Sequence, residues 1–218
     1  VEHGAQLIDI NMGCPAKRVT TGAAGAALLR DLPLARAILE AVRGAVGVPV
    51  TVKTRLGWDA EASTAVELAR MAEGCGLAMV TIHGRTRCQF YTGRADWAAI
   101  RPVKAAVSIP VIANGDVVAP ADGPAILAAS GADGVMIGRG AQGRPWFPGR
   151  VAQAIAGRTV EADPPLEEQR AVLLELYEGW LGLYGRALGV RQARKHVGWA
   201  LAAAASAVGP EPAAFVTA

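Results

Sequence analysis

The stretch Leu-Ile-Asp-Ile-Asn-Met-Gly-Cys-Pro at residues 7–15 decides the fold. It begins as a short apolar run typical of a β-strand and then reaches Cys14, which stands between Gly13 and Pro15. Because glycine and proline interrupt regular structure, the cysteine is expected in a turn just beyond the strand. The carboxyl ends of strands are where parallel α/β folds keep their chemistry. The stretch therefore predicts a functional thiol at the end of a parallel strand.

Four further β-rich runs follow, and segments of helical composition separate them. The runs are residues 7–11, 48–53, 79–83, 109–114 and 134–138, and the helical segments are residues 32–45, 60–73, 97–106, 120–129 and about 146–156. The runs are apolar throughout rather than alternating, so they predict parallel strands buried on both faces. Repeated βα units of this length fit either a TIM barrel or a doubly wound sheet.

The residues at the ends of these runs favour the barrel. Each run ends in groups able to do chemistry: Asn11 and Cys14; Lys53 and Arg55; His83 and Arg85; Asn114 and Asp116; Gly138 and Arg139. All strand ends of a barrel meet at one mouth, whereas an open sheet binds its ligands at a single switch point. We therefore expect an α/β fold of the (β/α)8 TIM-barrel type. Only five of eight strands can be counted, and the missing three are expected upstream of this chain.

The pattern changes after Pro164 and Pro165, where a small helical domain is expected. One long amphipathic helix is predicted over residues 166–184 and a second over about 190–203. The predicted domains are thus a barrel portion at residues 1–157 and a helical domain at residues 165–218. The Gly- and Pro-rich segment 209–212 is expected to end the helix and fray.

Composition restricts the class of protein. The 218 residues are 52% hydrophobic, and no apolar run approaches the roughly 18 residues that a membrane span needs. Three cysteines at unrelated spacings, without a paired CxxC, predict a reducing, cytoplasmic setting with no disulfide and no metal site. The net charge of +3 and pI near 9.0 permit a polyanionic partner without demonstrating one.

Two strand ends carry candidate catalytic or cofactor-binding groups. Cys14 is placed to act as a general acid, since an unperturbed thiol has a pKa of about 8.5. Cys75 and Cys88 lack its setting and are interpreted as ordinary structural cysteines. Lys53 and Arg55 end a strand inside the predicted barrel mouth, where partial loss of water favours an anionic partner.

The third strand end combines a histidine with two arginines. A single histidine is more often structural than catalytic, but His83 shares its loop with Arg85 and Arg87. This grouping predicts contact with a planar or anionic ligand.

The last two strand ends predict a phosphate site. Asn114-Gly115-Asp116 and Gly138-Arg139-Gly140 place glycines where backbone amides can approach a phosphate. Taken singly, each is an ordinary glycine turn. Their position after the last two strands is the usual phosphate site of TIM barrels.

The second C-terminal helix carries a basic stripe. Arg191, Arg194 and Lys195 stand at i, i+3 and i+4, beside His196. A solvated helix face is the usual interpretation of such a run. Contact with nucleic-acid phosphates is the alternative.

Taken together, the ordered motifs resemble the tRNA-dihydrouridine synthases, and most closely the bacterial B-type branch. The similar segments are Asp-Ile-Asn-Met-Gly-Cys-Pro at 9–15, Val-Lys-Thr-Arg at 52–55, Thr-Ile-His-Gly-Arg-Thr-Arg at 81–87, Ile-Ala-Asn-Gly-Asp at 112–116 and Met-Ile-Gly-Arg at 136–139. Residues 143–146 and 194–199 also fit that branch, so the likeness covers nearly the whole chain.

The resemblance implies an FMN-bearing TIM barrel followed by a helical tRNA-binding domain. Reduced flavin, recharged by NADPH or NADH, would give a hydride to C6 of a uracil flipped out of the tRNA. A cysteine, here Cys14 by motif position, would protonate C5. The family's flavin positions correspond to Lys53, His83, Asn114, Gly115, Asp116, Gly138 and Arg139. The candidates for the uracil are Asn11, Arg55, Arg85 and Arg87, and those for the tRNA backbone are Arg191, Arg194 and Lys195.

The departures from the family pattern predict an internal fragment. The family's first strand carries an Ala-Pro-Met flavin-binding turn and a later strand supplies a glutamine to the flavin; neither is present here. The helical domain also looks about one helix short. We therefore expect that the chain alone binds FMN poorly and has little activity, which a stoichiometric yellow flavin on the purified chain would refute.

Two other functions remain open at this stage. Another FMN-dependent TIM-barrel enzyme, such as a dihydroorotate dehydrogenase-like reductase, would not need the basic C-terminal helix. A catalytically inactive tRNA-binding remnant would not need Cys14. The chain is expected to act as a monomer, without a membrane or a metal.

Overall fold

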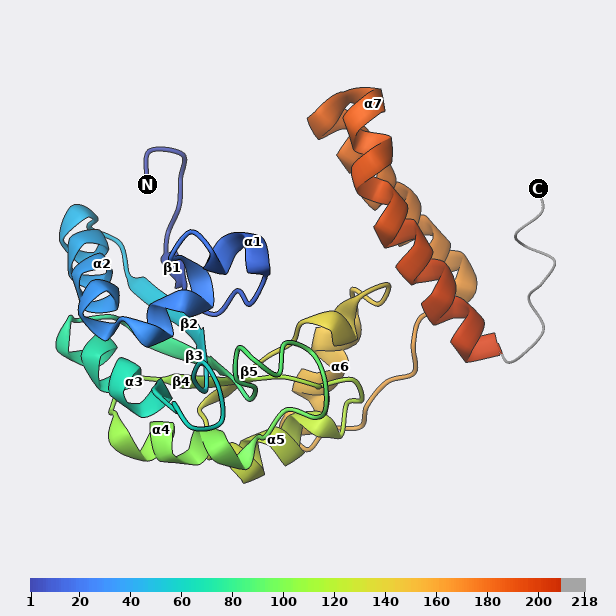
Figure 1. The fold of residues 1–218 in the computed structure, drawn as a ribbon. Coiled ribbons are helices and arrows are strands. Elements are labelled where there is room, and N and C mark those ends of the chain that lie inside the picture. The colour runs from blue at the N-terminus through green and yellow to red at the C-terminus, as the bar shows by residue number, and fades with distance from the viewer. Residues whose placement is uncertain (209–218) are drawn as a thin grey trace. The chain divides into compact units, whose positions relative to one another are not determined.

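A computed structural model describes residues 1–208, which form two compact units (Figure 1). The first unit is Val1–Val117 with Ala121–Gly138, and the second is Val118–Pro120 with the chain from Arg139 onward. The contacts thus divide the chain at residue 139, whereas the sequence predicted a boundary between 157 and 165. Close packing accounts for this, because a Cβ on Gly143 would lie only 2.2 Å from the Trp199 carbonyl oxygen. The predicted helix end at 209–212 lies outside the described residues.

The first unit is built on a five-stranded sheet. Its strands are β1 (Ile8–Asn11), β2 (Val50–Arg55), β3 (Met79–His83), β4 (Val111–Asn114) and β5 (Gly134–Met136). All neighbouring pairs are parallel, and the order in space, β1-β2-β3-β4-β5, repeats the order in the chain. A doubly wound sheet reverses its direction of growth at a switch point, and this sheet does not. The α/β fold with a parallel sheet is therefore confirmed and is consistent with part of a TIM barrel.

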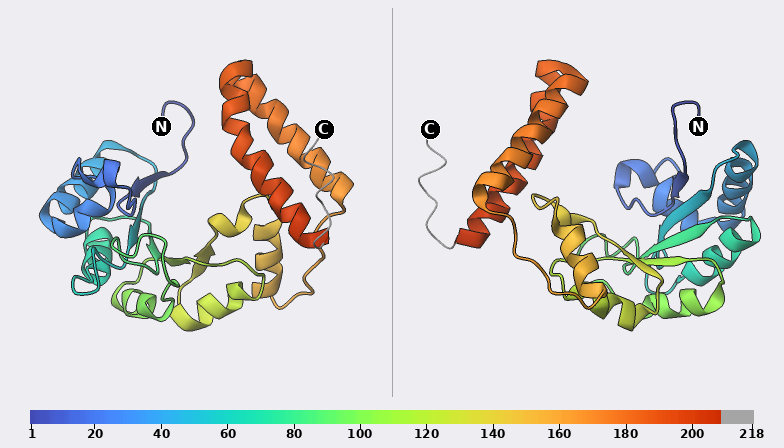
Figure 2. Two further views of the ribbon diagram at one scale, coloured as in Figure 1. Left: turned by 45° about the vertical axis from the view of Figure 1, so that its right-hand side comes forward. Right: turned by 180° about the vertical axis from the view of Figure 1, so that it is seen from behind.

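Helices connect the strands and cover one face of the sheet (Figures 1 and 2). In the first unit these are α1 (Lys17–Thr20), η1 (Gly25–Arg30), α2 (Leu32–Ala45), α3 (Ala65–Gly74), η2 (Ala98–Ile100), α4 (Arg101–Ala106) and α5 (Asp122–Ser130), where η marks a 3-10 helix. Helix α3 begins five residues later than the sequence predicted. The reason is a turn in which the Asp59 carboxylate accepts hydrogen bonds from the amides of Glu61 and Ala62.

The core lies between the sheet and these helices. The alternate strand residues that face the helices are fully buried and apolar: Val50, Val52, Val80, Ile82, Val111 and Ala113. The prediction that strands are buried on both faces holds for β2 and β3 but is wrong at the sheet edges. In β1 and β5 the side chains of Asn11 and Met136 are exposed, because an edge strand has one neighbour among the described residues.

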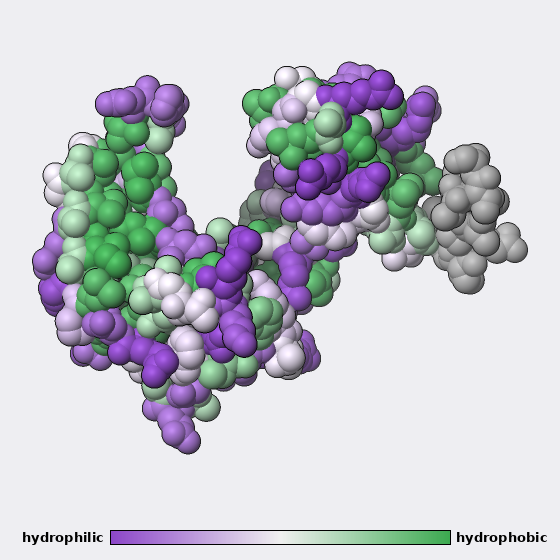
Figure 3. Space-filling view, turned by 45° about the horizontal axis from the view of Figure 1, so that its top comes forward, coloured by the Kyte–Doolittle hydropathy of each residue, from purple (hydrophilic) through white to green (hydrophobic). Residues whose placement is uncertain are grey.

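The second unit contains η3 (Arg139–Ala141), α6 (Phe147–Ile155) and the long α7 (Leu166–Val208). Gly185, with φ 69° and ψ 169°, breaks α7 into two arms. Both expected helices are present, and the second arm starts earlier and ends later than predicted. Apolar patches remain exposed on these arms, including Leu183 and Leu201 (Figure 3).

The two arms of α7 pack through aromatic rings. The Trp180 ring stacks on Tyr184 at 5.2 Å and lies 5.5 Å from His196, which lies 5.1 Å from Trp199. The two arms approach closely at Gly189, where a Cβ would lie 2.6 Å from the Trp180 carbonyl oxygen. The arms can therefore meet only because residue 189 has no side chain.

We expect Gly189→Ala to separate the two arms and lower the free energy of unfolding by about 1–3 kcal/mol, as overpacking does elsewhere. Gly182→Ala is the matched control, because a Cβ there meets nothing within 4 Å. That change should leave stability equal or raise it by up to about 1 kcal/mol, since alanine favours helix. Urea unfolding followed by circular dichroism measures both. Equal effects of the two substitutions would contradict the packing argument.

Candidate active site

The register of the sheet brings the predicted site residues of the first unit to one edge. Asn11 pairs with Lys53, Arg55 pairs with His83, and His83 pairs with Asn114. Neighbouring strands lie about 4.8 Å apart, so these carboxyl ends form a continuous row. Gly138 follows two residues after the end of β5. The sequence prediction that separate strand ends share one edge is thus met by the geometry of β1 to β4.

The loop that carries Cys14 is held by Asn11. The Asn11 side-chain oxygen accepts hydrogen bonds from the amides of Gly13 at 3.0 Å and Cys14 at 3.1 Å. The Met12 amide donates to the Lys53 carbonyl at 2.8 Å, which continues the β1–β2 pairing past the strand end. Cys14 is half-buried in this turn. The amide oxygen of Asn11, expected to contact a uracil, is therefore occupied in shaping the cysteine turn.

Gly25, the first residue of η1, packs directly against the Cys14 backbone. Its φ of +57° is a left-handed conformation, and a Cβ there would lie 2.8 Å from the Cys14 carbonyl oxygen. The next amide, of Ala26, donates to that same carbonyl at 3.0 Å. Cys14 is thus fixed by contacts from both β1 and η1.

Lys53 and His83 are partly removed from water and lie close to other cationic side chains. Burial lowers the pKa of Lys53 below its ordinary value, Arg55 lowers it further, and Asp9 opposes both. Lys53 forms no ion pair within the described part of the chain. Burial, followed by the charges of Arg55, Lys53 and Arg85, lowers the pKa of His83 to about 3. His83 is therefore a neutral imidazole near pH 7, suited to hydrogen bonding rather than to proton transfer.

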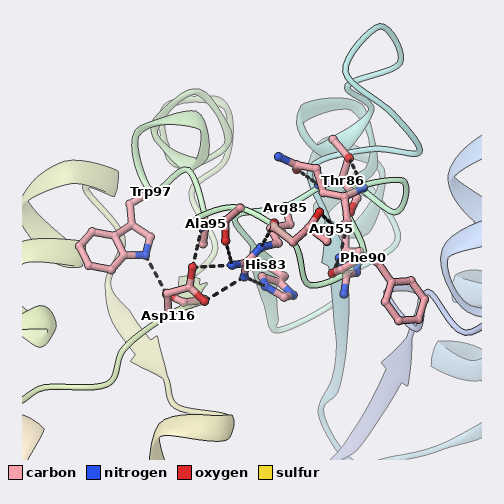
Figure 4. A network of polar contacts seen from close by, with 12 residues as sticks. Arg55, His83, Arg85, Thr86, Phe90, Ala95, Trp97 and Asp116 are labelled. Atoms are coloured by element: carbon pink, nitrogen blue, oxygen red, sulfur yellow. Dashed lines mark hydrogen bonds and ion pairs between the residues drawn. The ribbon is translucent and has the colours of Figure 1, made fainter.

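Two buried arginines donate hydrogen bonds to backbone carbonyls of the loop after β3 (Figure 4). The Arg55 guanidinium donates to the carbonyls of Gly13 at 2.8 Å, Thr86 at 2.9 Å and Phe90 at 2.8 Å. It therefore connects the cysteine turn to the loop that follows β3. Only 2% of Arg55 is exposed.

Arg85 closes the other half of this network. It binds both carboxylate oxygens of Asp116, at 3.0 and 2.6 Å, and donates to the carbonyls of Thr92 and Gly93. It also contacts the His83 ring nitrogen Nε2 at 3.3 Å. Only 2% of Arg85 is exposed, like Arg55. All three nitrogens of the Arg85 guanidinium, and Nε and Nη1 of Arg55, make contacts inside the protein. These contacts favour positioning roles over the uracil contacts expected from the sequence.

The loop after β4 also has a precise shape. Gly115 has a φ of +129°, and a Cβ there would lie 2.6 Å from the Ala95 Cβ and 3.0 Å from the His83 ring. The Trp97 indole donates to the Gly115 carbonyl at 2.7 Å, and the Asn114 side chain donates to the Met136 carbonyl at 2.8 Å. These contacts order the β4 end against its neighbours.

The acidic group of this loop cannot itself hold a phosphate. The Asp116 carboxylate is bound to Arg85 and also accepts from the Ala95 amide at 2.7 Å. Any contact of this segment with a phosphate would come from the backbone. Around Gly138, by contrast, a Cβ would meet nothing within 4 Å, so the backbone there is open.

The remaining predicted residues lie elsewhere. Arg87 packs its guanidinium on Trp58, at 4.7 Å from the ring. Arg139 begins η3 in the second unit. The residues of the basic stripe are exposed on the second arm of α7: Arg191, Arg194 and Lys195.

Sequence reasoning missed Trp58 and Trp97. Trp97 was assigned to a helical segment, but its indole hydrogen bond fixes the Gly115 turn. Trp58 lies three residues beyond the end of β2 and contacts two arginines. The signal was present in the sequence, since a tryptophan in a Gly- and Asp-containing loop after a strand is out of place on a solvated surface.

Comparison with known proteins identifies the family. The family model described as "Dihydrouridine synthase (Dus)" matches residues 1–209. The chain belongs to the dihydrouridine synthase family. The resemblance drawn from the sequence motifs is therefore confirmed.

Curated relatives of this family agree. The chain is 54% identical to the "Probable tRNA-dihydrouridine synthase" of Rhodobacter capsulatus over 94% of this chain and 63% of the relative. It is 52% identical to the protein of the same name from Rhizobium leguminosarum bv. phaseoli, over 99% and 66%. It is 53% identical to "tRNA-dihydrouridine synthase B" of Xanthomonas axonopodis pv. citri, over 91% and 60%. The chain thus spans slightly less than two thirds of each of these relatives.

No helix in residues 1–208 is both long and apolar enough to cross a membrane. Within the same residues, no three His, Cys, Asp or Glu side chains gather as a metal site would require.

The Arg85–Asp116 pair gives a stability prediction. Asp116→Ala should lower the free energy of unfolding by about 3–5 kcal/mol, because it leaves the buried Arg85 cation unpaired. The double variant Arg85→Met with Asp116→Ala should cost less than Asp116→Ala alone, because no unpaired cation remains. Urea unfolding of the two single variants and the double variant forms the necessary cycle. Additive costs would show that the two groups do not interact.

The His83 pKa gives a pH prediction. Between pH 6.5 and 3 the unfolded chain binds a proton on this histidine that the folded chain does not. Stability is therefore lost as pH falls, by about 2 kcal/mol from this group between pH 7 and 5. His83→Gln should flatten that part of the profile, measured by urea unfolding at several pH values. Parallel profiles for the two proteins would exclude the assignment.

Proposed function

We propose that this chain is the greater part of an FMN-dependent enzyme that reduces uridine to 5,6-dihydrouridine in tRNA. The observation that carries the proposal is the fixed half-buried Cys14 on the same strand-end row as Lys53 and His83. Family membership supplies the reaction, and the names of the relatives supply tRNA as the substrate class. The reductant is NADPH or NADH, and the protein acts as a cytoplasmic monomer.

The residues present fit a flavin. Lys53 is a partly buried cation without an ion pair in the described residues, so an electron-rich ring beside it would offset its cost of burial. His83 is neutral and offers hydrogen bonding without a competing charge. The open backbone at Gly138 leaves room for a phosphate. We assign the ring to Lys53 and His83, and the ribityl phosphate to the backbone near Gly115 and Gly138. The family resemblance adds Arg139 as a further candidate for the phosphate.

The proposed chemistry adds one hydride and one proton across a C5–C6 double bond. When bound and reduced, FMN supplies the hydride to C6 of the uracil. Cys14 supplies the proton to C5, and its thiolate then regains a proton from water. Asn11 keeps the thiol in place by fixing the Gly13 and Cys14 amides. Arg55 holds the same turn by donating a hydrogen bond to the Gly13 carbonyl.

The RNA has to present an unstacked base to this row. Extruding a base costs a few kcal/mol, which contacts to the surrounding phosphates would offset. Exposed cations are available for this on both units. We assign Arg191, Arg194 and Lys195 of the second unit to the tRNA backbone, as the sequence predicted.

The decisive test is Cys14→Ala in the full-length protein, with Cys88→Ala as the matched control because Cys88 is exposed in a different loop. Dihydrouridine formation should fall by about 10² to 10⁴, the usual contribution of a general acid. Flavin content and flavin reduction by NADPH should not change. Mass spectrometry of tRNA nucleosides measures the product. Equal product from the Cys14 variant and the control would rule out Cys14 as the acid.

A further inference from the structure

Two arginines from different loops lie against one tryptophan ring. The Arg30 guanidinium carbon lies 4.9 Å from the Trp58 ring centroid, and that of Arg87 lies 4.7 Å from it. Both distances end at one ring, so the two positive charges lie at most about 10 Å apart. Each contact is a cation–π interaction. The proposed function described above makes no use of Arg30 or Trp58.

These two cations have no carboxylate partner in the described part of the chain. Neither Arg30 nor Arg87 forms an ion pair there, and Arg87 donates one side-chain hydrogen bond, to the Thr20 hydroxyl at 3.3 Å. The nearest carboxylates in sequence are used elsewhere. Asp31 caps α2 by accepting from the Leu34 amide, and Asp59 accepts from two amides of its own turn. Two like charges are thus held close together without neutralisation, which favours an anionic ligand.

The cluster is part of the same strand-end structure as Cys14. Arg30 is the last residue of η1, whose first residue, Gly25, packs on the Cys14 carbonyl. A 3-10 helix rises about 2 Å per residue, so Arg30 lies on the order of 10 Å from the cysteine turn. The Arg87 amide donates to the Gly57 carbonyl, and the Cys88 amide donates to the Trp58 carbonyl. Loops after β1, β2 and β3 therefore meet at Trp58.

We propose that Arg30 and Arg87, held on Trp58, bind backbone phosphates of the RNA next to the reacting nucleotide. The inference rests on the proposed function and names a contact within it. Guanidinium groups suit phosphate because their N–H donors form a planar fork, and stacking on an aromatic ring fixes that plane. The short helix α1, which contacts Arg87 through Thr20, adds the exposed Lys17 and Arg18. Such a row of cations suits successive phosphates of a polynucleotide better than a single dinucleotide.

The test measures binding of a fluorescein-labelled tRNA transcript to the chain by anisotropy at 50–200 mM salt. Arg30→Gln and Arg87→Gln should each weaken binding about 3- to 10-fold and lower the salt slope by about 0.7 to 1. Arg70→Gln is the matched control, because Arg70 is an exposed arginine on α3 and the charge change is identical. It should bind like the wild type to within about twofold.

Each alternative outcome has a distinct meaning. Wild-type affinity and salt slope in Arg30→Gln would overturn the phosphate site and leave the proposed function standing. A lower unfolding midpoint in both variants with unchanged RNA affinity would show that the contacts of Arg30 and Arg87 with Trp58 only stabilise the packing of the three loops. If NADPH displaces the RNA from the wild type but from neither variant, the two arginines bind a phosphate of the dinucleotide and not one of the RNA. Failure of the wild-type chain to bind the transcript would count against the proposed RNA substrate itself.

Discussion

The parallel register of β1 to β5 is the constraint on which the candidate site depends. Each strand pairs with its neighbour in the chain, so Asn11, Lys53, His83 and Asn114 reach one edge although about one hundred residues separate the first from the last. Register in a sheet is strongly specified when one face is buried, because a slip of one residue exposes that face to water. The fully buried Val and Ile side chains under α2 to α5 therefore fix the position of the chemistry on the opposite side.

The arginines near this edge act in two different ways, and their surroundings decide which. Arg55 and Arg85 are almost fully buried, and loop carbonyls or the Asp116 carboxylate accept their hydrogen bonds. Charge buried in this way is costly unless it is paired, so such a group holds its loop in one conformation. Arg30 and Arg87 lie on an aromatic ring with no carboxylate partner in the described residues. They keep the capacity to meet a ligand's charge.

The sequence predicted the strands well because each is a short apolar run that ends in a glycine or polar signal. Strand β3 has the predicted bounds, Met79–His83, and α2 has the predicted 32–45. Local pattern could not reveal which face of each edge strand would stay exposed, since that depends on the neighbours a strand finds. It also could not separate fully buried arginines from half-buried ones. Arg55, Arg85 and Arg87 look alike in sequence, and only the carbonyl groups of the folded loop distinguish them.

Burial of the strand ends also lowers the pKa values of Lys53 and His83. Burial, reinforced by the positive charges of Arg55, Lys53 and Arg85, lowers the pKa of His83 to about 3. A histidine that stays neutral cannot deliver a proton to a substrate, and neither can an arginine. Of the side chains that the sequence assigned to this edge, the Cys14 thiol is the one that we assign as the proton donor. The turn that carries this thiol is held in place by Asn11, Gly25 and Arg55, so the proposed acid has a fixed position beside the cationic strand ends.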